Sequence, residues 1–526
     1  MPRHGKRKEF DILIIGTGIS GLTAAYWLSE AGYEVAVISK DANLSECNTQ
    51  YAQGGIVFKH EHDSPGLLQK DIIAAGCAIN FDNAVKAVAE EGPALVQDFL
   101  IDRVSVPFCR DNENNLEFTQ EGAHSVRRII HVKDKTGAAI EKSLLDATLN
   151  KKHITFFPAH TAVELITSSH NSMNPQDRYQ KTRVIGAYVL NAKTESVDVF
   201  IAGAVVLATG GVGHLFLHTS NTVGATGDGV AMACRIGAEI INAEYIQFHP
   251  TILYHRDVKR FLITEALRGE GARLKNRDNE FFMRKYHGKL ADLAPRDEVS
   301  RAIFYEMEKT DSEYVLLDTQ EIKSLSLHER FPAIYAQCKE LGIDIEKEPV
   351  PVVPAAHYFC GGIKVDLCGR TNISGLFAVG ENSCTGVHGA NRLASVSLLE
   401  GLLWGKKTAL AISDAIQPVS QKLIKNIPEW IFPLNEEVFD PVLILQDMVN
   451  VRTTMWNYAG IVRNKNRLSR ALADLNYLSH RIEKFYKQAK ITRRIIELRN
   501  AVLTSLLIVR AASANKTSCG CHFIEE

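Results

Sequence analysis

The chain has 526 residues and a mass of 58.3 kDa, which allows about three to four domains at roughly 150 residues per domain. A hydrophobic content of 45% and a charged content of 23% exclude a disordered, collagen-like or disulfide-dense chain. The 60 Lys and Arg residues against 61 Asp and Glu give a net charge of -1, which excludes an overall attraction to nucleic acid or to an anionic membrane. Any anionic ligand must therefore be bound by local groups.

The N-terminal segment carries four lysines and arginines from Arg3 to Lys8, followed by an apolar run. Asp11 interrupts that run at its start, and the glycines from Gly16 end it too early for the apolar core of a signal peptide. We therefore expect a solvated tail that leads into a strand. The most apolar stretch elsewhere, residues 501–512, contains an arginine and is shorter than the roughly 18 residues of a spanning helix. We predict no membrane segment.

The first 30 residues of the apolar region predict a strand, a glycine turn, a helix and a second strand at Val35–Ser39. The turn, Gly16–Gly21, reads GxGxxG, and its glycines let the backbone approach a pyrophosphate at the N-terminus of the helix. This context predicts a dinucleotide site. Lys40 stands where an acidic residue usually receives the ribose hydroxyls, which disfavours NAD and leaves FAD open.

Later segments predict that the same sheet is completed after long insertions. Ala204–Ala208 is an apolar strand followed by glycines, and Gly375–Glu381 (GLFAVGE) has the same pattern. We expect an α/β fold: a Rossmann-like FAD-binding domain with an inserted α+β capping domain and a C-terminal helical domain. The predicted bounds are 1–241 and 355–418 for the FAD-binding domain, 242–354 for the capping domain and 419–526 for the helical domain.

Eight short motifs occur in a fixed order between residues 16 and 400. They are Gly16–Gly21, Asn48–Gly55 (NTQYAQGG), Thr226–Ala238 (TGDGVAMACRIGA), Gln247–Thr251 (QFHPT), Thr264–Ala272 (TEALRGEGA), Pro295–Arg301 (PRDEVSR), His357–Ile363 (HYFCGGI) and His388–Glu400 (HGANRLASVSLLE). This series resembles the flavoprotein family that contains the flavoprotein subunits of succinate dehydrogenase and fumarate reductase, together with the L-aspartate oxidases.

Within that family the chain most resembles the L-aspartate oxidases, through EALRGEGA, VVPAAHY, TGVHGANRLAS, TQEGAHSVRRIIH and MWNYAGIVRNKNRL. The resemblance implies FAD-dependent oxidation of L-aspartate to iminoaspartate, by hydride transfer from C2 to flavin N5. This would be the first step of NAD biosynthesis through quinolinate, with O2 or fumarate reoxidising the flavin and a possible transient contact with quinolinate synthase. The alternative is a soluble fumarate reductase or succinate dehydrogenase-type flavoprotein.

One position distinguishes the branches of the family. Membrane-complex members have a histidine that bonds covalently to the flavin at the place of Asn48, and asparagine has no nucleophilic ring nitrogen, so the resemblance implies non-covalent FAD. It also implies that Ser397 and Leu398 begin a helix whose dipole stabilises negative charge near flavin N1. The FAD contacts carried over are Gly16, Thr17, Gly18, Ile19, Ser20, Gly21, Lys40, Asn48, Thr49, Gln50, Tyr51, Ala52, Gln53, Gly54, Gly55, Asp228, Glu381, Ser397 and Leu398.

A dicarboxylate brings two negative charges into a closed site, which must therefore supply cations and hydrogen-bond donors. By resemblance, the substrate-binding residues are His249, Thr264, His357 and Arg392. The guanidinium of Arg392 can hold a carboxylate in a bidentate fork, which lysine cannot reproduce.

Two residues are candidates for catalysis. By resemblance Arg296 lies between substrate and flavin, and because a guanidinium is almost never deprotonated we expect it to orient a carboxylate and to carry a proton only in the reductive direction. Glu121 is the better candidate for meeting the substrate ammonium, and the alternative is a surface glutamate in a polar loop. Glu265 either forms a proton relay or pairs with Arg268.

Ten cysteines without regular spacing indicate packed thiols in a reducing compartment. The only close pair, Cys519 and Cys521, lacks a second pair of ligands, and we predict no metal site. We therefore expect a cytoplasmic protein whose ligands are small molecules.

Overall fold

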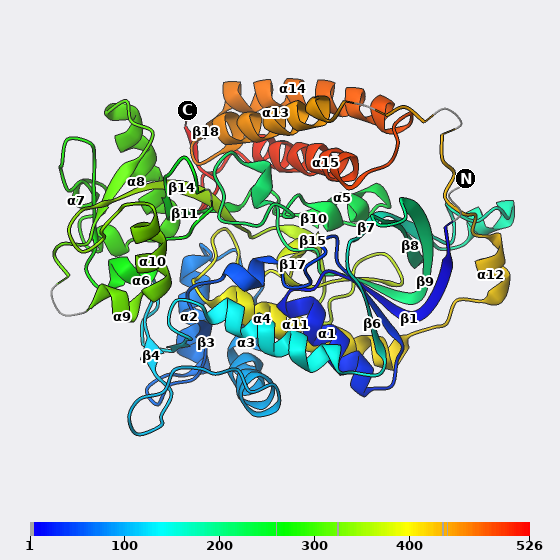
Figure 1. The fold of residues 1–526 in the computed structure, drawn as a ribbon, viewed down its shortest axis with the longest axis horizontal. Helices are drawn as coiled ribbons and strands as arrows, with labels where there is room; N and C mark the ends of the chain where they lie inside the picture. Colours follow the sequence, from blue (N-terminus) through cyan, green and yellow to red (C-terminus); the bar gives the residue numbers. More distant parts are fainter. Residues whose placement is uncertain (1–4, 259, 323–325, 434–435, 439, 526) are drawn as a thin grey trace.

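The computed structural model describes residues 5–258, 260–322, 326–433, 436–438 and 440–525, so Arg3 of the predicted tail lies outside the described residues. The largest sheet in these ranges has seven strands in the order β6-β2-β1-β9-β8-β7, with β16 also paired to β9 (Figure 1). Its strands are β1 (Arg7–Ile15), β2 (Val35–Ile38), β6 (Ile154–Phe157), β7 (His160–Thr167), β8 (Val184–Asn191), β9 (Ser196–Leu207) and β16 (Leu376–Ala378).

The sheet confirms the predicted α/β class. Strands β6, β2, β1, β9 and β16 are parallel, while β7 and β8 extend the sheet in antiparallel fashion. Helix α1 (Ile19–Glu30) connects β1 to β2, as the glycine turn predicts. The segment Ala204–Ala208 is the end of a longer strand, because β9 pairs with β1 from Val199 to Leu207.

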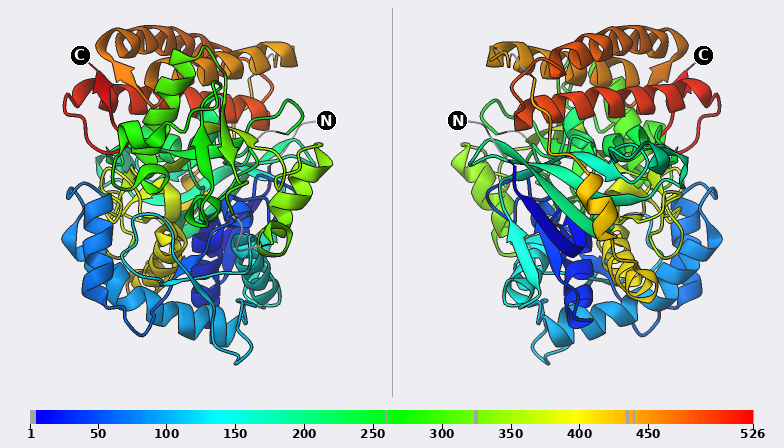
Figure 2. Two further views of the ribbon diagram at one scale, coloured as in Figure 1. Left: turned by 90° about the vertical axis from the view of Figure 1, so that its left-hand side faces the viewer. Right: turned by 90° about the vertical axis from the view of Figure 1, so that its right-hand side faces the viewer.

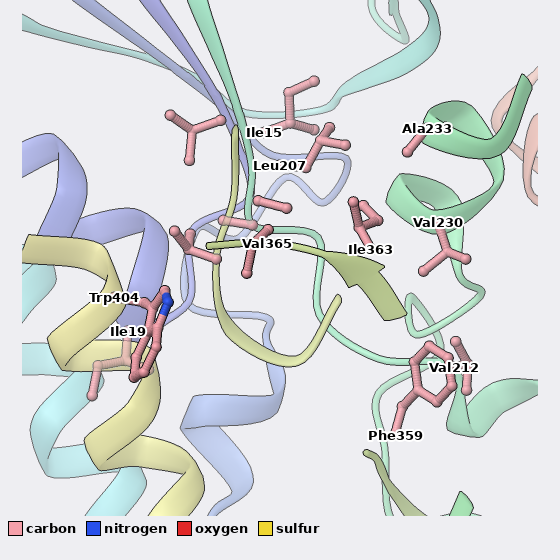
Figure 3. Packing of buried hydrophobic residues seen from close by; sticks show 14 of the residues in the cluster. Ile15, Ile19, Leu207, Val212, Val230, Ala233, Phe359, Ile363, Val365 and Trp404 are labelled. Atoms are coloured by element: carbon pink, nitrogen blue, oxygen red, sulfur yellow. The ribbon is translucent and has the colours of Figure 1, made fainter. Parts of the chain in front are cut away.

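Helices cover the sheet on both faces. On one face α1 packs against α4 (Thr136–Leu149) and against α11 (Val396–Ala415), which in turn contacts α3 (Asp82–Leu95). Figure 3 shows the indole of Trp404, from α11, next to Ile19 at the start of α1. Trp404 is fully buried. Helix α2 (Pro65–Ala75) packs on α3.

The predicted capping segment has an antiparallel sheet in the order β11-β14-β13-β12. Buried apolar residues between Leu253 and Val352 form a hydrophobic cluster distinct from the main core, which supports a separate unit near the predicted range 242–354. Its elements are β11 (Ile246–Leu253), α6 (Glu265–Gly269), β12 (Arg273–Lys275), α7 (Met283–Tyr286), α8 (Arg296–Lys309), β13 (Val315–Asp318), α9 (Leu327–Arg330), α10 (Pro332–Glu340) and β14 (Val350–Phe359).

The C-terminal region is helical, with α12 (Gln421–Asn426), α13 (Pro441–Ala459), α14 (Lys465–Tyr486) and α15 (Arg493–Ala514). Figures 1 and 2 place α13 to α15 on the side of the sheet opposite α1 and α3. Most of their buried apolar residues belong to the main hydrophobic core, whereas Ile495 and Ile496 of α15 pack in a separate cluster with β7, β8 and β9. These helices therefore complete the cores on this side of the large sheet. The domain bounds themselves stay a prediction. Within the described ranges, no helix is long and apolar enough to cross a membrane.

Three small sheets and one further helix complete the elements that surround the site. The sheets are β10-β15-β17, β3-β5-β4 and β18-β19. Their bounds, with that of helix α5, are β3 (Ile56–Val57), β4 (Phe118–Thr119), β5 (Ile129–Ile130), α5 (Asp228–Arg235), β10 (Ile240–Ile241), β15 (Gly362–Lys364), β17 (Ser383–Cys384), β18 (Arg463–Asn464) and β19 (Ile524–Glu525).

Candidate active site

A cavity of about 510 Å³ lies between the ends of the parallel strands and the capping segment. All predicted cofactor, substrate and catalytic residues line it with one exception, Gly21. Gly21 lies inside α1, where an added Cβ would collide with the carbonyl of Gly16. A glycine is needed at this position so that the helix can pack closely against the turn. Gly21 is not part of the cavity wall.

The turn at Gly16 forms one end of the cavity. Gly16 has φ +121°, a conformation that favours glycine, and an added Cβ there would collide with the carbonyl of Ala208. Gly18 precedes α1 and has no side chain to cap it, while the first N–H of the helix, that of Ile19, donates to Thr49 Oγ1 at 3.1 Å. The next N–H groups of the first turn and the positive end of the helix dipole fit the pyrophosphate of FAD.

The predicted cofactor residues Lys40 and Asp228 form an ion pair at the same end of the cavity. Lys40 Nζ also lies 3.0 Å from Glu497 Oε1 of α15, which ties the C-terminal helices to the cavity wall. Lys40 is therefore fixed by two carboxylates.

Asn48 lies in a network of polar groups on the cavity wall. Its Nδ2 donates to Glu381 Oε2 at 3.1 Å, and its Oδ1 accepts from the Thr222 N–H at 3.1 Å. Burial raises the pKa of Glu381 to about 7. Gln53 Oε1 is buried and has no hydrogen-bond partner in the described part of the chain. A ring system with amide-like donors and acceptors would satisfy such groups, so the residues present fit FAD.

The N-terminus of α11 forms the wall beside this network. Ser395 occupies the N-cap with φ 58° and does not cap the helix, so the N–H groups at the start of the helix have no side-chain cap among the described residues. Ser397 and Leu398 both line the cavity. The helix dipole therefore favours negative charge in the cavity at this point, as the sequence predicts.

Two histidines lie together at the capping end of the cavity. His249 is on β11 and His357 on the neighbouring strand β14, with ring centroids 5.1 Å apart. His249 Nδ1 accepts from the Thr251 N–H at 3.2 Å, and His357 Nδ1 is 2.7 Å from the Ser220 hydroxyl. Burial and the nearby arginines hold the pKa of both imidazoles well below the usual range, so both rings are neutral near pH 7.

Arg296 is held at the start of α8 by two partners. Its Nε donates to Glu265 Oε2 at 2.6 Å, and its Nη1 donates to Gln247 Oε1 at 3.2 Å. Arg268 Nη2 lies 3.9 Å from the same Glu265 oxygen. Burial alone would raise the pKa of Glu265, but these two guanidinium groups lower it to about 2. Glu265 is thus an anion that positions Arg296, which favours ion pairing over a proton relay, with Arg296 as a nearer partner than the predicted Arg268.

Arg392 offers free hydrogen-bond donors inside the cavity. Its Nη1 donates to the Ser397 hydroxyl at 2.9 Å, and its guanidinium carbon lies 4.5 Å from the ring centroid of Tyr358. Its buried Nε has no partner within the described ranges. An unpaired buried donor is costly, so this arrangement suits an anionic ligand. Thr264 lines the cavity nearby at the N-cap of α6.

Glu121 is buried, with 7% of its surface exposed, so the alternative of a surface glutamate is wrong. Its Oε2 accepts from the Ser395 hydroxyl at 2.7 Å. Gly54 leaves the space for this carboxylate, because an added Cβ would lie 2.5 Å from Glu121 Oε1. Burial and the neighbouring Glu265 raise the pKa of Glu121.

Three residues in this site were not selected from the sequence: Ser220, Gln247 and Ser395. The role of a fourth, Glu265, as the partner of Arg296 was not predicted either. Gln247, Glu265 and Ser395 lie inside the motifs, so a rule that examined every polar residue of each motif would have found them. Ser220 lies outside all eight motifs, and only its contact with His357 reveals it.

Comparisons with known proteins show the family of the chain. The family model described as "FAD binding domain" matches residues 11–398, and "Fumarate reductase flavoprotein C-term" matches residues 448–526. The chain is 42% identical over 517 residues to the L-aspartate oxidase of Acinetobacter baylyi, which covers 98% of this chain and 93% of that protein. It is 38% identical over 550 residues to the chloroplastic L-aspartate oxidase of Arabidopsis thaliana, covering 99% and 81%.

A mutant of the E. coli quinol fumarate reductase subunit FrdA has a similar structure, with a TM-score of 0.88 and 27% sequence identity. That match covers 99% of this chain and 92% of the other. Sequence and fold thus agree over nearly the whole length of the chain. The chain therefore belongs to the succinate dehydrogenase and fumarate reductase flavoprotein family and, within it, to the L-aspartate oxidases.

Proposed function

We propose that the chain oxidises L-aspartate to iminoaspartate with FAD as its cofactor, the first step of NAD biosynthesis through quinolinate. One observation carries the choice of substrate: a buried carboxylate, Glu121, shares the cavity with the two guanidinium groups of Arg296 and Arg392. Such a cavity is complementary to two carboxylates and one ammonium group. Succinate has no ammonium group and would offer the Glu121 carboxylate no cationic partner.

The arginines and histidines bind the two carboxylates of the substrate. Arg392 has a free Nε beside its Nη groups and can hold one carboxylate in a fork. Arg296 is oriented by Glu265, while His249 and His357, which are neutral, add hydrogen bonds without adding charge. Two separate clamps on the two carboxylates of a four-carbon substrate would hold it in one orientation for transfer of its C2 hydrogen. FAD, when bound, supplies the hydride acceptor at N5.

The substrate ammonium must lose a proton before or during the oxidation. Arg296 is unsuited to accept this proton, because its guanidinium stays protonated. Glu121 is a carboxylate whose pKa is raised by burial, and this brings its basicity closer to the operating pH. We assign to Glu121 the binding of the ammonium group and propose it as the group that receives the proton.

We further propose that O2, which would yield peroxide, or fumarate, which would yield succinate, reoxidises the flavin. We also propose a cytoplasmic location and, from the resemblance to L-aspartate oxidases, a transient contact with quinolinate synthase, which would receive the unstable iminoaspartate. All ten cysteines, each within the described residues, are free thiols, which supports a reducing compartment.

Anaerobic mixing tests the proposed function directly. The flavin-loaded protein is mixed with L-aspartate, D-aspartate or succinate while the flavin absorbance is recorded. We expect bleaching by L-aspartate and no bleaching by the other two. Bleaching by succinate alone would overturn the proposal and favour the succinate dehydrogenase-type alternative.

A further inference from the structure

Three side chains with metal-binding atoms meet at the base of the loop that carries Glu121. Cys109, Glu117 and His131 each offer one ligand atom, and these three atoms all lie within 4.8 Å of one another. The group lies outside the active-site cavity. His131 ends the motif TQEGAHSVRRIIH, whereas Cys109 and Glu117 lie outside the motifs found in the sequence.

The small sheet β3-β5-β4 brings these residues together. Phe118 pairs with Ile130 in the antiparallel register of β4 and β5, which places Glu117 opposite His131. The Cys109 N–H donates to the His131 carbonyl at 2.8 Å, and the Glu117 N–H donates to the Cys109 carbonyl at 3.0 Å. The three residues therefore lie side by side on three hydrogen-bonded segments, and backbone hydrogen bonds fix the spacing of their side chains.

The state of each side chain suits a metal ligand. His131 is 6% exposed, and its buried Nδ1 has no hydrogen-bond partner among the described residues, which is costly for a polar atom. Cys109 Sγ accepts the Lys133 N–H at 3.4 Å, and such a bond would stabilise a thiolate. Glu117 is exposed, which gives an ion a route from solvent.

We propose that Cys109, Glu117 and His131 bind a divalent cation of the Zn²⁺ class. Sulfur, imidazole nitrogen and carboxylate oxygen are its usual ligands, and water would occupy the fourth tetrahedral position. The Cys109 thiol loses its proton to solvent when the metal–sulfur bond forms. The thiolate and carboxylate then supply two negative charges against the two positive charges of the ion. The positive charge of Arg330 acts on His131 and would weaken binding of the cation. The thiolate and the carboxylate would still neutralise the charge of the ion.

The proposed ion would fix both ends of the loop 120–128, which joins β4 to β5. Glu117 precedes β4, His131 follows β5, and Glu121 lies in the loop between these strands. The other side of this loop is already held by the ion pairs of Arg128 with Asp63 at 3.0 Å and with Asp71 at 2.7 Å. If the proposed function holds, the cation is a positioning element for Glu121 and improves L-aspartate binding.

Cobalt titration of the flavin-loaded protein tests the site after removal of metal with a chelator. We expect one equivalent of Co²⁺ to give tetrahedral d–d bands at wavelengths longer than the flavin absorption, and Zn²⁺ to abolish them. Cys109→Ser and Glu117→Gln are expected to weaken binding by roughly tenfold or more. Cys368→Ser, at another partly exposed free cysteine, is the matched control and keeps the bands. Missing bands in the wild type, or unchanged bands in Cys109→Ser, would overturn the site.

Kinetics tests the link to Glu121 separately. We expect Zn²⁺ to lower the KM for L-aspartate in the wild type and in Cys368→Ser, with kcat unchanged, and to have no effect in Cys109→Ser. Metal binding with an unchanged KM would overturn the positioning role. The cobalt spectrum does not depend on turnover, so failure of the proposed oxidase activity and failure of the metal site give different results.

Discussion

The Glu121 carboxylate accepts a hydrogen bond from the Ser395 hydroxyl, with 2.7 Å between the two oxygens. Ser395 has φ 58° and precedes α11, and its hydroxyl also accepts the Gly55 N–H at 3.3 Å. Because the hydroxyl binds Glu121, it does not cap the helix. One serine therefore holds the acid at the proposed ammonium site and leaves the N-terminus of α11 open toward the proposed flavin site.

Glu121→Gln is expected to separate the oxidation of L-aspartate from the reduction of fumarate. Gln removes both the charged hydrogen bond to the ammonium, worth about 1.5–3 kcal/mol, and the proposed proton acceptor, worth about 100-fold or more, so kcat/KM for L-aspartate should fall by roughly 1,000-fold or more. Fumarate reduction by the reduced flavoprotein should change little, because fumarate has no ammonium. Glu113→Gln, at an exposed residue just before the same loop, is the control. Equal losses in both activities would remove Glu121 from this role.

Arg392→Lys is expected to impair both reactions together. Lysine keeps the charge but cannot form the fork with a carboxylate, and both L-aspartate and fumarate carry that group. Loss of one charge-assisted hydrogen bond predicts a rise in KM of roughly tenfold or more for each substrate. Steady-state kinetics and the flavin content of the purified protein measure this, with the exposed Arg256→Lys as control. An unchanged KM would show that Arg392 does not bind the carboxylate.

The fold follows from local patterns more closely than the site does. The turn at Gly16 predicts the first strand, helix and strand because residues a few positions apart determine that unit. The contact of Glu121 with Ser395 joins residues 274 positions apart, and no local pattern contains it. The same holds for Ser220 and His357, which are 137 positions apart. The sequence favours Glu121 as the group that meets the ammonium but leaves a surface glutamate open, because its polar neighbours are typical of an exposed loop.

We expect denaturation of the protein to release the flavin intact. Asn48 lines the cavity at the position where the resemblance implies a flavin-bonding histidine in the membrane-complex members, and its amide is occupied by Glu381 and the backbone of Thr222. An amide of this kind forms no covalent bond to a flavin ring. After acid precipitation all the flavin should remain in the supernatant, where its absorbance is measured. Fluorescent flavin on the protein band of a denaturing gel would contradict this.

Glu141→Gln is expected to make the fold more stable, increasingly so as the pH rises. Glu141 lies in α4, fully buried, and its carboxylate oxygens have no hydrogen-bond partner within the described residues. Burial raises its pKa from 4.5 to about 8. The folded state therefore keeps the proton through neutral pH while the unfolded state loses it, so this group lowers the free energy of unfolding as the pH rises from 4.5 to 8.

Each pH unit in that window corresponds to about 1.4 kcal/mol for one such group, and Gln removes the dependence. The difference in Tm between Glu141→Gln and the wild type should therefore widen from pH 5 toward pH 8 and stay constant above it. Thermal unfolding followed by circular dichroism measures this, and Glu90→Gln, an exposed residue of α3, should show no such trend. If the Tm difference for Glu141→Gln were the same at all pH values, Glu141 would titrate normally and would have to be ionised in the folded core.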